Sequence, residues 1–378
     1  MKKVSRFLYI LIISMVFHNT GLAGEVIYQK ATPTITRITL NSEYDVQSLN
    51  STLYVSDNEI WLAGASGSSE TWLVCINANG EILSERTIVD APGKYPMISS
   101  ISKVGDTLLL GFIDAENQCG NIGILRGSDE KVMYYPVNSD VKVMDMVFVS
   151  AGIMTVGVIY DTDNNVSSLY SSLTVDTGEV LFEKNDIITT NMTTDEYALS
   201  SSKVTATVDG YFIQANVGRE SRLQPEKLLI RLDASGNEQW RATLPDTFSA
   251  QRMSTSDGYI YLYGISGELN EYDTLANHKA AVYCFSVDGV EQWQQVFDKP
   301  DSFYYGTSGN GVSVAIEGNA EQDSWHMCSL DAMGNPRNMA SVEFSAPSYM
   351  RGVNLTPSGH AKIIGVTDSQ LFMFDMPY

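Results

Sequence analysis

A repeat of about fifty residues runs along this 378-residue chain. Six of the seven copies follow turn residues such as Asp57-Asn58 or Asp257-Gly258, which reach positive φ easily and close hairpins. A hairpin repeated seven times predicts that copies of one supersecondary unit pack against each other. The copies are short apolar segments that end in small residues 46 to 58 positions apart, namely Gly64, Gly111, Gly157, Ala215, Gly264, Ala315 and Gly365.

A second series of strand–turn–strand segments lies between these copies, so each unit contains two hairpins, or four strands. The copy expected near Gly127 is degenerate, and no long window has the 3.6-residue apolar period of a helix. Four strands repeated seven times predict an all-β protein, a seven-bladed β-propeller with four antiparallel strands in each blade. The turn glycines of the second series are Gly80, Gly178, Gly236, Gly289 and Gly334.

The two ends of the chain suggest how such a ring closes. After Gly365 only one more strand fits, around residues 371–374, so the seventh unit lacks its fourth strand. The segment Ile35 to Leu40 has strand character and precedes the first complete unit. We therefore expect this N-terminal strand to complete the last blade, which would leave no open edge and would make residues 25–378 one domain.

The first 24 residues have the pattern of a secretory signal peptide. Three basic residues lie within the first six positions, an apolar run covers residues 7–17, and Leu22-Ala23-Gly24 offers small residues for cleavage. The apolar run is too short to span a bilayer, and the first cysteine is Cys75, which rules out an anchor on an N-terminal lipidated cysteine. We expect an exported protein that is periplasmic or secreted, without a membrane span.

Composition narrows the classes of partner. The chain has 24 Lys plus Arg against 45 Asp plus Glu, a formal net charge of -21. Nucleic acids and anionic lipids bind to clustered basic residues, so neither is an expected partner. Hydrophobic residues make up 44% of the chain, which is enough for a large core and excludes disorder as the main state.

About five of the seven units resemble one family of propellers, and three of them carry its motif as follows. In Asp233-Ala-Ser-Gly236-Asn-Glu-Gln-Trp240, an acidic residue and a turn glycine are followed by a tryptophan four positions later. The segment 286–293 keeps the glycine and the tryptophan, and 175–182 has Phe182 in place of the tryptophan. This pattern resembles the repeat of quinoprotein-like propellers, in which it ties adjacent blades together.

The resemblance implies an architecture and leaves the activity open. That superfamily includes quinone-dependent dehydrogenases, with eight blades and an adjacent Cys-Cys pair at the cofactor, and non-enzymatic envelope scaffolds such as the propeller subunit of outer-membrane protein assembly machinery. This chain shows seven units, no adjacent cysteines and no Cys-x-x-Cys-His haem motif. These departures favour the non-enzymatic branch, without a cofactor.

No catalytic or metal-binding pattern emerges from the residues. His278, His326 and His360 fall in three different units, and neither a Gly-x-Ser-x-Gly elbow nor a phosphate loop occurs. The segment 161–165 begins like a calcium loop but lacks the required glycine and bidentate glutamate. We therefore predict no catalytic residue and no metal site. Four cysteines allow three disulfide pairings, and free thiols on strands are the ordinary alternative.

The candidate binding residues are aromatic or arginine side chains just before, or early in, the predicted inner strands. In a propeller such positions share one face around the channel mouth, and tyrosine and arginine are enriched in protein interfaces. Equally, these rings could fill gaps between blades. The predicted binding residues are Tyr44, Tyr95, Tyr197, Arg252, Tyr305, Tyr349 and Arg351.

These observations lead to a functional hypothesis and one alternative. The first is an exported, monomeric, non-enzymatic propeller that binds a protein or peptide partner in the cell envelope, helped by two long loops at 216–227 and 266–279 on the same face. The alternative is an envelope glycan-binding protein or glycan-active enzyme that would use tyrosine rings and two carboxylates at the channel mouth.

Overall fold

The computed structural model describes residues 29–377. Its description leaves out positions 31–33, 41–43, 67–69, 128, 130, 150–151, 162, 164–165, 192–198, 208, 218–225, 270–274, 301–302, 310–311, 319–323, 344–347 and 368–369. The predicted signal peptide lies outside the described residues.

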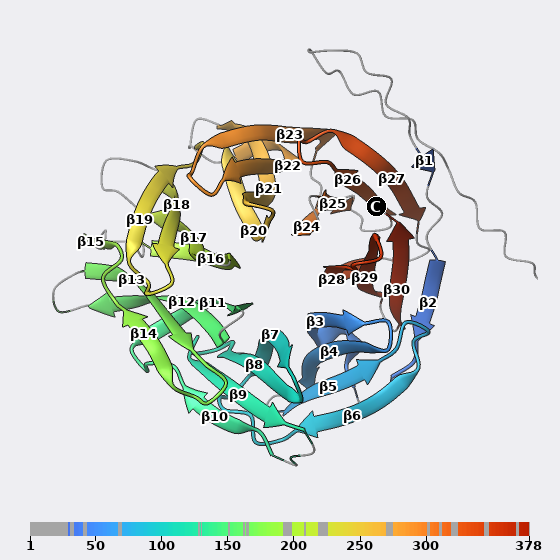
Figure 1. Ribbon diagram of the computed structural model, residues 1–378, viewed down its shortest axis with the longest axis horizontal. Helices are drawn as coiled ribbons and strands as arrows, with labels where there is room; N and C mark the ends of the chain where they lie inside the picture. The colour runs from blue at the N-terminus through green and yellow to red at the C-terminus, as the bar shows by residue number, and fades with distance from the viewer. Residues whose placement is uncertain are drawn as a thin grey trace, which may run out of the picture.

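The strands form sheets that are arranged around a ring (Figure 1). Blades 1 to 3 are β3 (Leu49–Ser56), β4 (Glu59–Ser66), β5 (Glu70–Ile76) and β6 (Ile82–Ile88); then β7 (Pro96–Val104), β8 (Thr107–Asp114), β9 (Gly120–Arg126) and β10 (Met133–Pro136); then β11 (Val141–Val149), β12 (Gly152–Asp161), β13 (Val166–Thr174) and β14 (Val180–Lys184), to which β15 (Thr189–Asn191) is added.

Three further blades follow in the same way, each from consecutive strands. Blades 4 to 6 are β16 (Leu199–Thr207), β17 (Gly210–Val217), β18 (Glu226–Asp233) and β19 (Glu238–Thr243); then β20 (Phe248–Ser256), β21 (Tyr259–Leu269), β22 (Leu275–Ser286) and β23 (Glu291–Pro300); then β24 (Phe303–Gly309), β25 (Val312–Gly318), β26 (Ser324–Leu330) and β27 (Pro336–Glu343), beside which lies β1 (Gln29–Lys30).

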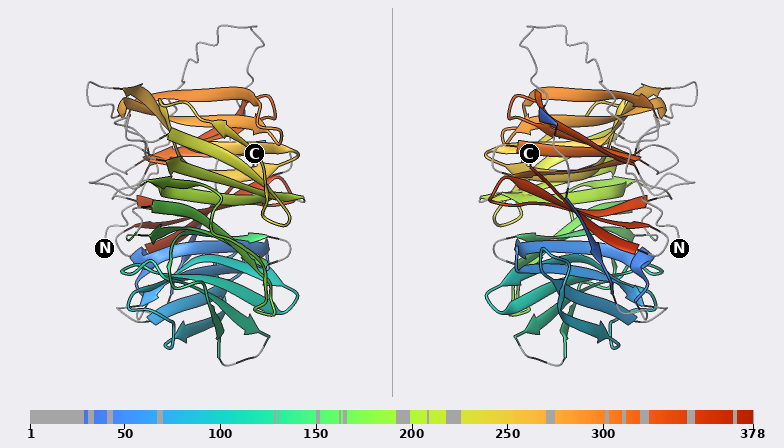
Figure 2. Two further views of the ribbon diagram at one scale, coloured as in Figure 1. Left: turned by 90° about the vertical axis from the view of Figure 1, so that its left-hand side faces the viewer. Right: turned by 90° about the vertical axis from the view of Figure 1, so that its right-hand side faces the viewer.

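The remaining sheet, called the closing sheet below, combines both ends of the chain. It consists of β28 (Ser348–Leu355), β29 (His360–Thr367), β30 (Gln370–Pro377) and the N-terminal β2 (Thr34–Ile38). Strand β2 pairs antiparallel with β30, with Ile38 opposite Leu371. The side views show β2 running alongside the C-terminal strands (Figure 2). The one helical element described is a 3-10 turn, η1 (Val46–Ser48), which leads into β3.

The predicted fold class needs correction. Seven blades of four antiparallel strands were expected, with an N-terminal strand completing the last one, but the ring has six blades of consecutive strands, and the expected N-terminal strand lies in the closing sheet. Two sheets have five strands, because β15 also pairs with β13 and β1 pairs in parallel with β27. The repeat pattern missed these additions because β1 and β15 are only two and three residues long and lie outside the periodic hairpins.

The predicted hairpin turns are local structures that the glycines permit. The turn glycines of the second series have φ between +77° and +86°, a region that other residues rarely adopt. They are Gly80, Gly178, Gly236, Gly289 and Gly334.

The core lies mainly between neighbouring sheets. One cluster joins Val156 and Leu169 of blade 3 to Ile213 and Ile230 of blade 4, and all four side chains are fully buried. A second cluster joins the closing sheet to blade 1 and contains Ile38 and Trp72. Alternating apolar residues on both faces of each blade therefore hold the ring together, as the repeat pattern predicts.

Aromatic side chains on outer strands also link consecutive blades. Trp240 of β19 donates its Nε1 hydrogen to the Val287 carbonyl of blade 5 at 3.1 Å, and Trp293 of β23 donates to the Ala332 carbonyl of blade 6 at 2.9 Å. Their rings lie against the turn glycines Gly289 and Gly334. Phe182 lies against Gly236 in the same way between blades 3 and 4. The contact between blades implied by the sequence motif is therefore present.

The cysteines are free thiols, and those in strands are buried. Cys75, Cys284 and Cys328 lie in β5, β22 and β26, whereas Cys119 is exposed. Burial raises the pKa of the Cys284 thiol to about 12, so this thiol stays protonated and packs as a small apolar group.

Candidate binding site in the central channel

The first strand of each sheet faces the channel, and most of these inner strands are interrupted at one equivalent place. A register shift occurs in β3, β7, β11, β16, β20 and β28, whereas β24 pairs regularly with β25. Such a β-bulge inserts a residue, bends the strand and changes the direction of nearby side chains. The bulges thus form a ring of similar distortions around the channel.

The small residues of the sequence repeat stand opposite these bulges. Gly264 of β21 pairs with Ala250, next to the shift between Ala250 and Arg252, and a Cβ on Gly264 would lie 1.9 Å from the Ser249 carbonyl oxygen. The other repeat glycines pair beside a shift in the same way, at Leu49, Ser100, Val143 and Met350. The absence of a side chain therefore lets the distorted inner strand approach its neighbour.

A cavity of about 280 Å³, called the channel cavity below, lies within this ring of bulges. Six inner strands contribute to its lining, so residues 300 positions apart in the sequence meet there. The lining consists of Asn50, Ser51, Thr52, Ser99, Ser100, Ile101, Asp145, Met146, Val147, Phe148, Lys203, Val204, Arg252, Met253, Arg351, Val353 and Asn354.

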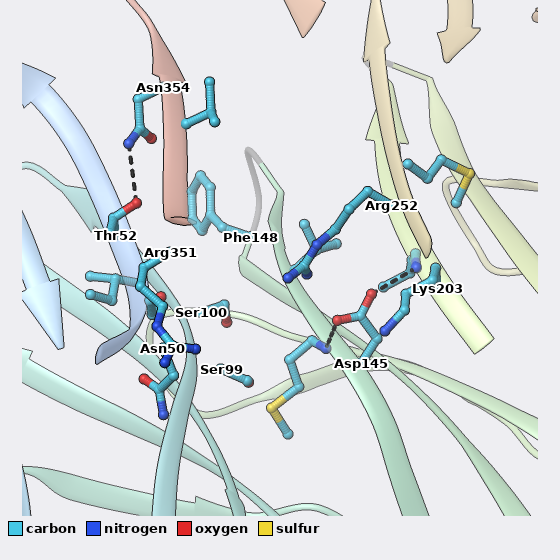
Figure 3. Close-up of a pocket in the computed structure, with 17 residues that line it drawn as sticks. Asn50, Thr52, Ser99, Ser100, Asp145, Phe148, Lys203, Arg252, Arg351 and Asn354 are labelled. Carbon is cyan, nitrogen blue, oxygen red and sulfur yellow. Dashed lines mark hydrogen bonds between the residues drawn. The ribbon is translucent and has the colours of Figure 1, made fainter. Parts of the chain in front are cut away.

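The charged groups of the channel cavity are arranged unequally. Figure 3 shows Asp145, Lys203 and Arg252 together on one side, and Arg351 with Asn50 and Ser99 on the other. With three cations and one carboxylate, the lining carries a formal charge of three minus one, or two positive charges. The chain as a whole has a net charge of -21. The cavity is therefore a local positive region in an acidic protein.

Asp145 is held by backbone groups of two blades. Its Oδ2 accepts a hydrogen bond of 3.1 Å from the Val204 backbone N–H of blade 4, and its Oδ1 accepts one of 3.1 Å from the N–H of Met146. Burial raises the pKa of the Asp145 carboxyl, although Lys203 and Arg252 nearby act in the opposite direction. The carboxylate thus bridges blades 3 and 4 and offsets part of the local positive charge.

The opposite side of the cavity joins the closing sheet to blade 1. Arg351 donates through a terminal guanidinium nitrogen to the Gln47 carbonyl at 2.8 Å. Asn354 donates its Nδ2 hydrogen to Thr52 Oγ1 at 3.1 Å. These bonds orient Arg351 and Asn354 at the cavity wall and also fasten the two ends of the ring.

Two buried oxygen atoms of the lining lack a hydrogen-bond partner within the described part of the chain. They are the amide oxygen of Asn50 and the hydroxyl oxygen of Ser100. An unsatisfied buried polar atom is unfavourable by about 1–3 kcal/mol, so such atoms in a cavity indicate where water or a ligand would bind.

The structure separates the predicted binding residues into two groups. Arg252 and Arg351 line the channel cavity. Tyr95 and Tyr349 lie at the start of β7 and β28, are 43% and 39% exposed, and each has a cation near its ring: Lys94 at 5.3 Å and Arg351 at 5.6 Å, respectively. Tyr349 thus lies beside an arginine of the cavity lining, whereas Tyr95 lies just before the inner strand that carries Ser99 and Ser100.

The other predicted residues do not join this group. Tyr44 is half-buried with its ring centroid 5.7 Å from that of Trp72, so it fills space in the core beside blade 1. Tyr197 lies outside the described residues, and for Tyr305 only the backbone in β24 is described.

Sequence reasoning missed Asp145, Lys203 and the polar residues of β3 and β7. A usable signal was present, because these residues stand 11 to 14 positions before the repeat glycine or alanine of their own unit. Aligning the units on that residue would have placed them with Arg252 and Arg351 at one level of the ring. A search for aromatic residues instead favoured the strand beginnings.

No group of three or more His, Cys, Asp and Glu side chains in the described ranges could hold a metal ion. Within those ranges, no helix is long and apolar enough to cross a membrane.

Comparisons with known proteins identify the architecture. No family model matches the chain, and no curated protein matches it in sequence. Solved structures do match over most of its length. The β-propeller domain of the Trilobed protease from Pyrococcus furiosus, described as having an open velcro topology, is 14% identical with a TM-score of 0.52, over 87% of this chain and 94% of that one.

Two further structures lead to the same conclusion. YCF48 from Cyanidioschyzon merolae is 10% identical with a TM-score of 0.55, over 90% of this chain and 98% of that one. Drosophila Semaphorin 2a is 8% identical with a TM-score of 0.56, over 92% and 76% of the two chains. Because a shared fold at this level of sequence identity does not imply a shared function, the comparisons establish the fold alone. The chain has a β-propeller fold.

Proposed function

We propose that this protein is an exported, non-enzymatic scaffold of the cell envelope that binds a protein or peptide partner on the channel face. The observation that carries the proposal is the exposed Tyr349 ring, which lies 5.6 Å from Arg351 of the positively charged cavity. A second exposed ring, Tyr95, precedes the inner strand β7 and has Lys94 5.3 Å from its centroid. Tyrosine and arginine contribute strongly to interfaces because they combine large contact area with directed polar groups.

A capture experiment tests the binding part of the proposal. The purified chain is used to capture proteins from envelope extract, and each captured protein is then purified and titrated against it. The double variant Tyr95→Ala/Tyr349→Ala should weaken binding of a true partner by about tenfold or more, as expected for interface aromatics.

The matched control removes comparable exposed apolar surface elsewhere. Leu83 and Val290, 53% and 59% exposed, lie on β6 and in the turn before β23. The variant Leu83→Ala/Val290→Ala should leave the affinity nearly unchanged. Equal losses in both double variants, or the absence of any partner together with turnover of a small substrate, would contradict the proposal. Binding to a glycan array would favour the glycan alternative instead.

The compartment is tested separately. If residues 1–24 are a signal peptide, protein recovered from the envelope or the medium should begin near Gly24 or Glu25. N-terminal sequencing that found Met1 on that material would exclude cleavage.

A further inference from the structure

The charge of the channel cavity differs from that of the chain. Acidic residues outnumber basic ones by 45 to 24 overall, yet Lys203, Arg252 and Arg351 face a single carboxylate, Asp145, in the cavity lining. Walls of low dielectric strengthen the field of such charges. The cavity therefore favours an anionic ligand carrying about two negative charges, which would balance the lining.

The cations lie on two sides of the cavity. Arg252 projects from β20 beside Asp145, and Arg351 projects from β28 beside Asn50 (Figure 3). A planar guanidinium group can donate two parallel hydrogen bonds, and the oxygen atoms of either a carboxylate or a phosphate can accept them. The arrangement suits a ligand with an anionic group at each end.

The remaining lining favours an organic ligand over an inorganic ion. Apolar residues also contribute to the lining, and Val147 and Phe148 among them are partly exposed. A carbon skeleton would cover these side chains, whereas an inorganic ion would leave them in contact with water. The unpartnered Asn50 and Ser100 oxygens could accept hydrogen bonds from hydroxyl or amide groups, and the volume of about 280 Å³ is at the small end for ligand sites.

We infer that the channel cavity binds a small organic ligand with two carboxylates, one held by Arg252 and the other by Arg351. This chemistry has two sources: a free dicarboxylate, or the C-terminal residue of a peptide ending in Asp or Glu, which carries two carboxylates a few carbon atoms apart. In its peptide form the inference rests on the proposed function, because the end of the partner would enter the cavity.

Calorimetric titration of the full chain distinguishes the sources. The probes are glutarate, its uncharged diamide, inorganic phosphate, a pentapeptide ending in Glu with a free carboxylate, and the same peptide amidated at its C-terminus. Glutarate or the free-acid peptide should bind at least about tenfold more tightly than its amide counterpart, because the amide lacks the charge-assisted hydrogen bonds. Binding of glutarate identifies a free dicarboxylate as sufficient; binding of the free-acid peptide alone identifies the peptide source.

Three outcomes would overturn the inference. The first is that neither glutarate nor the free-acid peptide binds at about 10 mM, which would mean a negligible affinity. The second is that the acid and amide forms bind equally well. The third is that phosphate binds more tightly than both glutarate and the free-acid peptide.

Variants then test the assigned residues. Arg252→Gln and Arg351→Gln should each weaken binding by about tenfold. Arg37→Gln removes the same charge from an exposed position on β2, and should change the affinity by less than about twofold, because screened surface charges act weakly at this distance. Equal effects of Arg252→Gln and Arg37→Gln would contradict the assignment.

A variant that is expected to bind the ligand more tightly provides a further test, because a loss of folding could only weaken binding. Asp145→Asn removes the one opposing charge of the lining while its amide oxygen can still accept from the Val204 N–H, so binding should become at least about threefold tighter. Unchanged or weaker binding would overturn the charge assignment. Failure of the proposed function is separable, because Tyr95→Ala, whose ring lies by Lys94 and not in the cavity lining, should weaken partner capture and leave glutarate binding intact.

Discussion

Single residues decide how closely neighbouring blades approach. The turn glycine of one blade lies under an aromatic ring of the previous one, and the ring nitrogen bonds to a carbonyl of the same turn. The glycine is needed twice, since its φ is positive and a side chain would collide with the ring. Local backbone freedom and packing between blades therefore depend on one position.

Two glycines allow these effects to be separated. Gly258 has φ +80° and open space around a built Cβ, whereas Gly289 has φ +81° and a Cβ there would lie 2.9 Å from the Trp240 ring. Gly258→Ala should lower the free energy of unfolding by about 1 kcal/mol, from backbone strain alone. Gly289→Ala should lower it by a further ~1 kcal/mol or more, because the ring must move. Equal losses in urea unfolding would contradict a role for the aromatic contact.

A partly buried ion cluster in the closing sheet predicts acid sensitivity. Burial alone would raise the pKa of Asp375, but hydrogen bonds from Lys362 and His360 outweigh it and hold that pKa below its ordinary value. The ionised Asp375 carboxylate therefore stabilises the folded state fully at a pH above its unfolded-state pKa of about 4. This stabilisation is lost as the pH falls through the lower pKa that Asp375 has in the folded state.

Asp375→Asn should thus lower the free energy of unfolding by about 1–2 kcal/mol at pH 7, and the difference should shrink at pH 3. Asp209→Asn is the control, because the Asp209 carboxylate is 60% exposed beside Arg231 and should contribute less than about 1 kcal/mol. Urea unfolding of both variants at the two pH values provides the measurement. A pH-independent loss in Asp375→Asn would contradict the assigned pKa.

At the scale of elements, strand β2 has a much larger role than its five residues suggest. It forms the outer strand of the closing sheet, and Ile38 joins the cluster between that sheet and blade 1. The other isoleucine of the strand, Ile35, is three positions away, on the opposite face, and is exposed. The strand therefore contributes both backbone pairing and one buried anchor.

The two isoleucines of β2 form a matched pair for measurement. Ile38 is 4% exposed and Ile35 is 44% exposed. Ile38→Ala should lower the free energy of unfolding by about 2–4 kcal/mol through lost burial and a residual cavity, whereas Ile35→Ala should lower it by less than ~1 kcal/mol. Chemical denaturation of both variants checks this order, and the reverse order would show that β2 is attached differently.

At the scale of the whole molecule, the two chain ends meet at one seam. Besides the β2–β30 pairing, Arg351 and Asn354 of β28 bond to residues at the start of blade 1, and the Gln47 side chain donates to the Thr367 carbonyl. Of these residues, Arg351 and Asn354 also line the channel cavity. Ring closure and the candidate site are thus coupled through Arg351.

Truncation tests this coupling. Deleting residues 1–40 removes β2, whereas deleting residues 1–33 keeps it, and both remove β1. The longer deletion should lower the melting temperature by several degrees more than the shorter one and promote aggregation, because it exposes the edge of β30. Thermal melts at equal concentration provide the comparison. Coincident melting curves would contradict closure by β2.

Much of this fold could be predicted from local sequence. The turn glycines, the alternating strands between them and the motif ending in Trp240 act over a few residues, and each has a physical reason that does not depend on distant contacts. The predicted closing segment 35–40 overlaps β2, because an unpaired strand at each end of a repeat has few other partners. The short additions β1 and β15 could not be predicted, since they have no periodic pattern.

The candidate site shows where local information ends. From the sequence alone come the β-propeller class, the acidic charge and the strands that carry Arg252 and Arg351, because periodicity and composition are properties of the chain itself. Only the tertiary structure brings Asp145, Lys203 and Asn50 into one cavity with them. The reason is geometric: the bulges turn these side chains toward the channel, and the closed ring brings together strands that are separated by up to 300 residues.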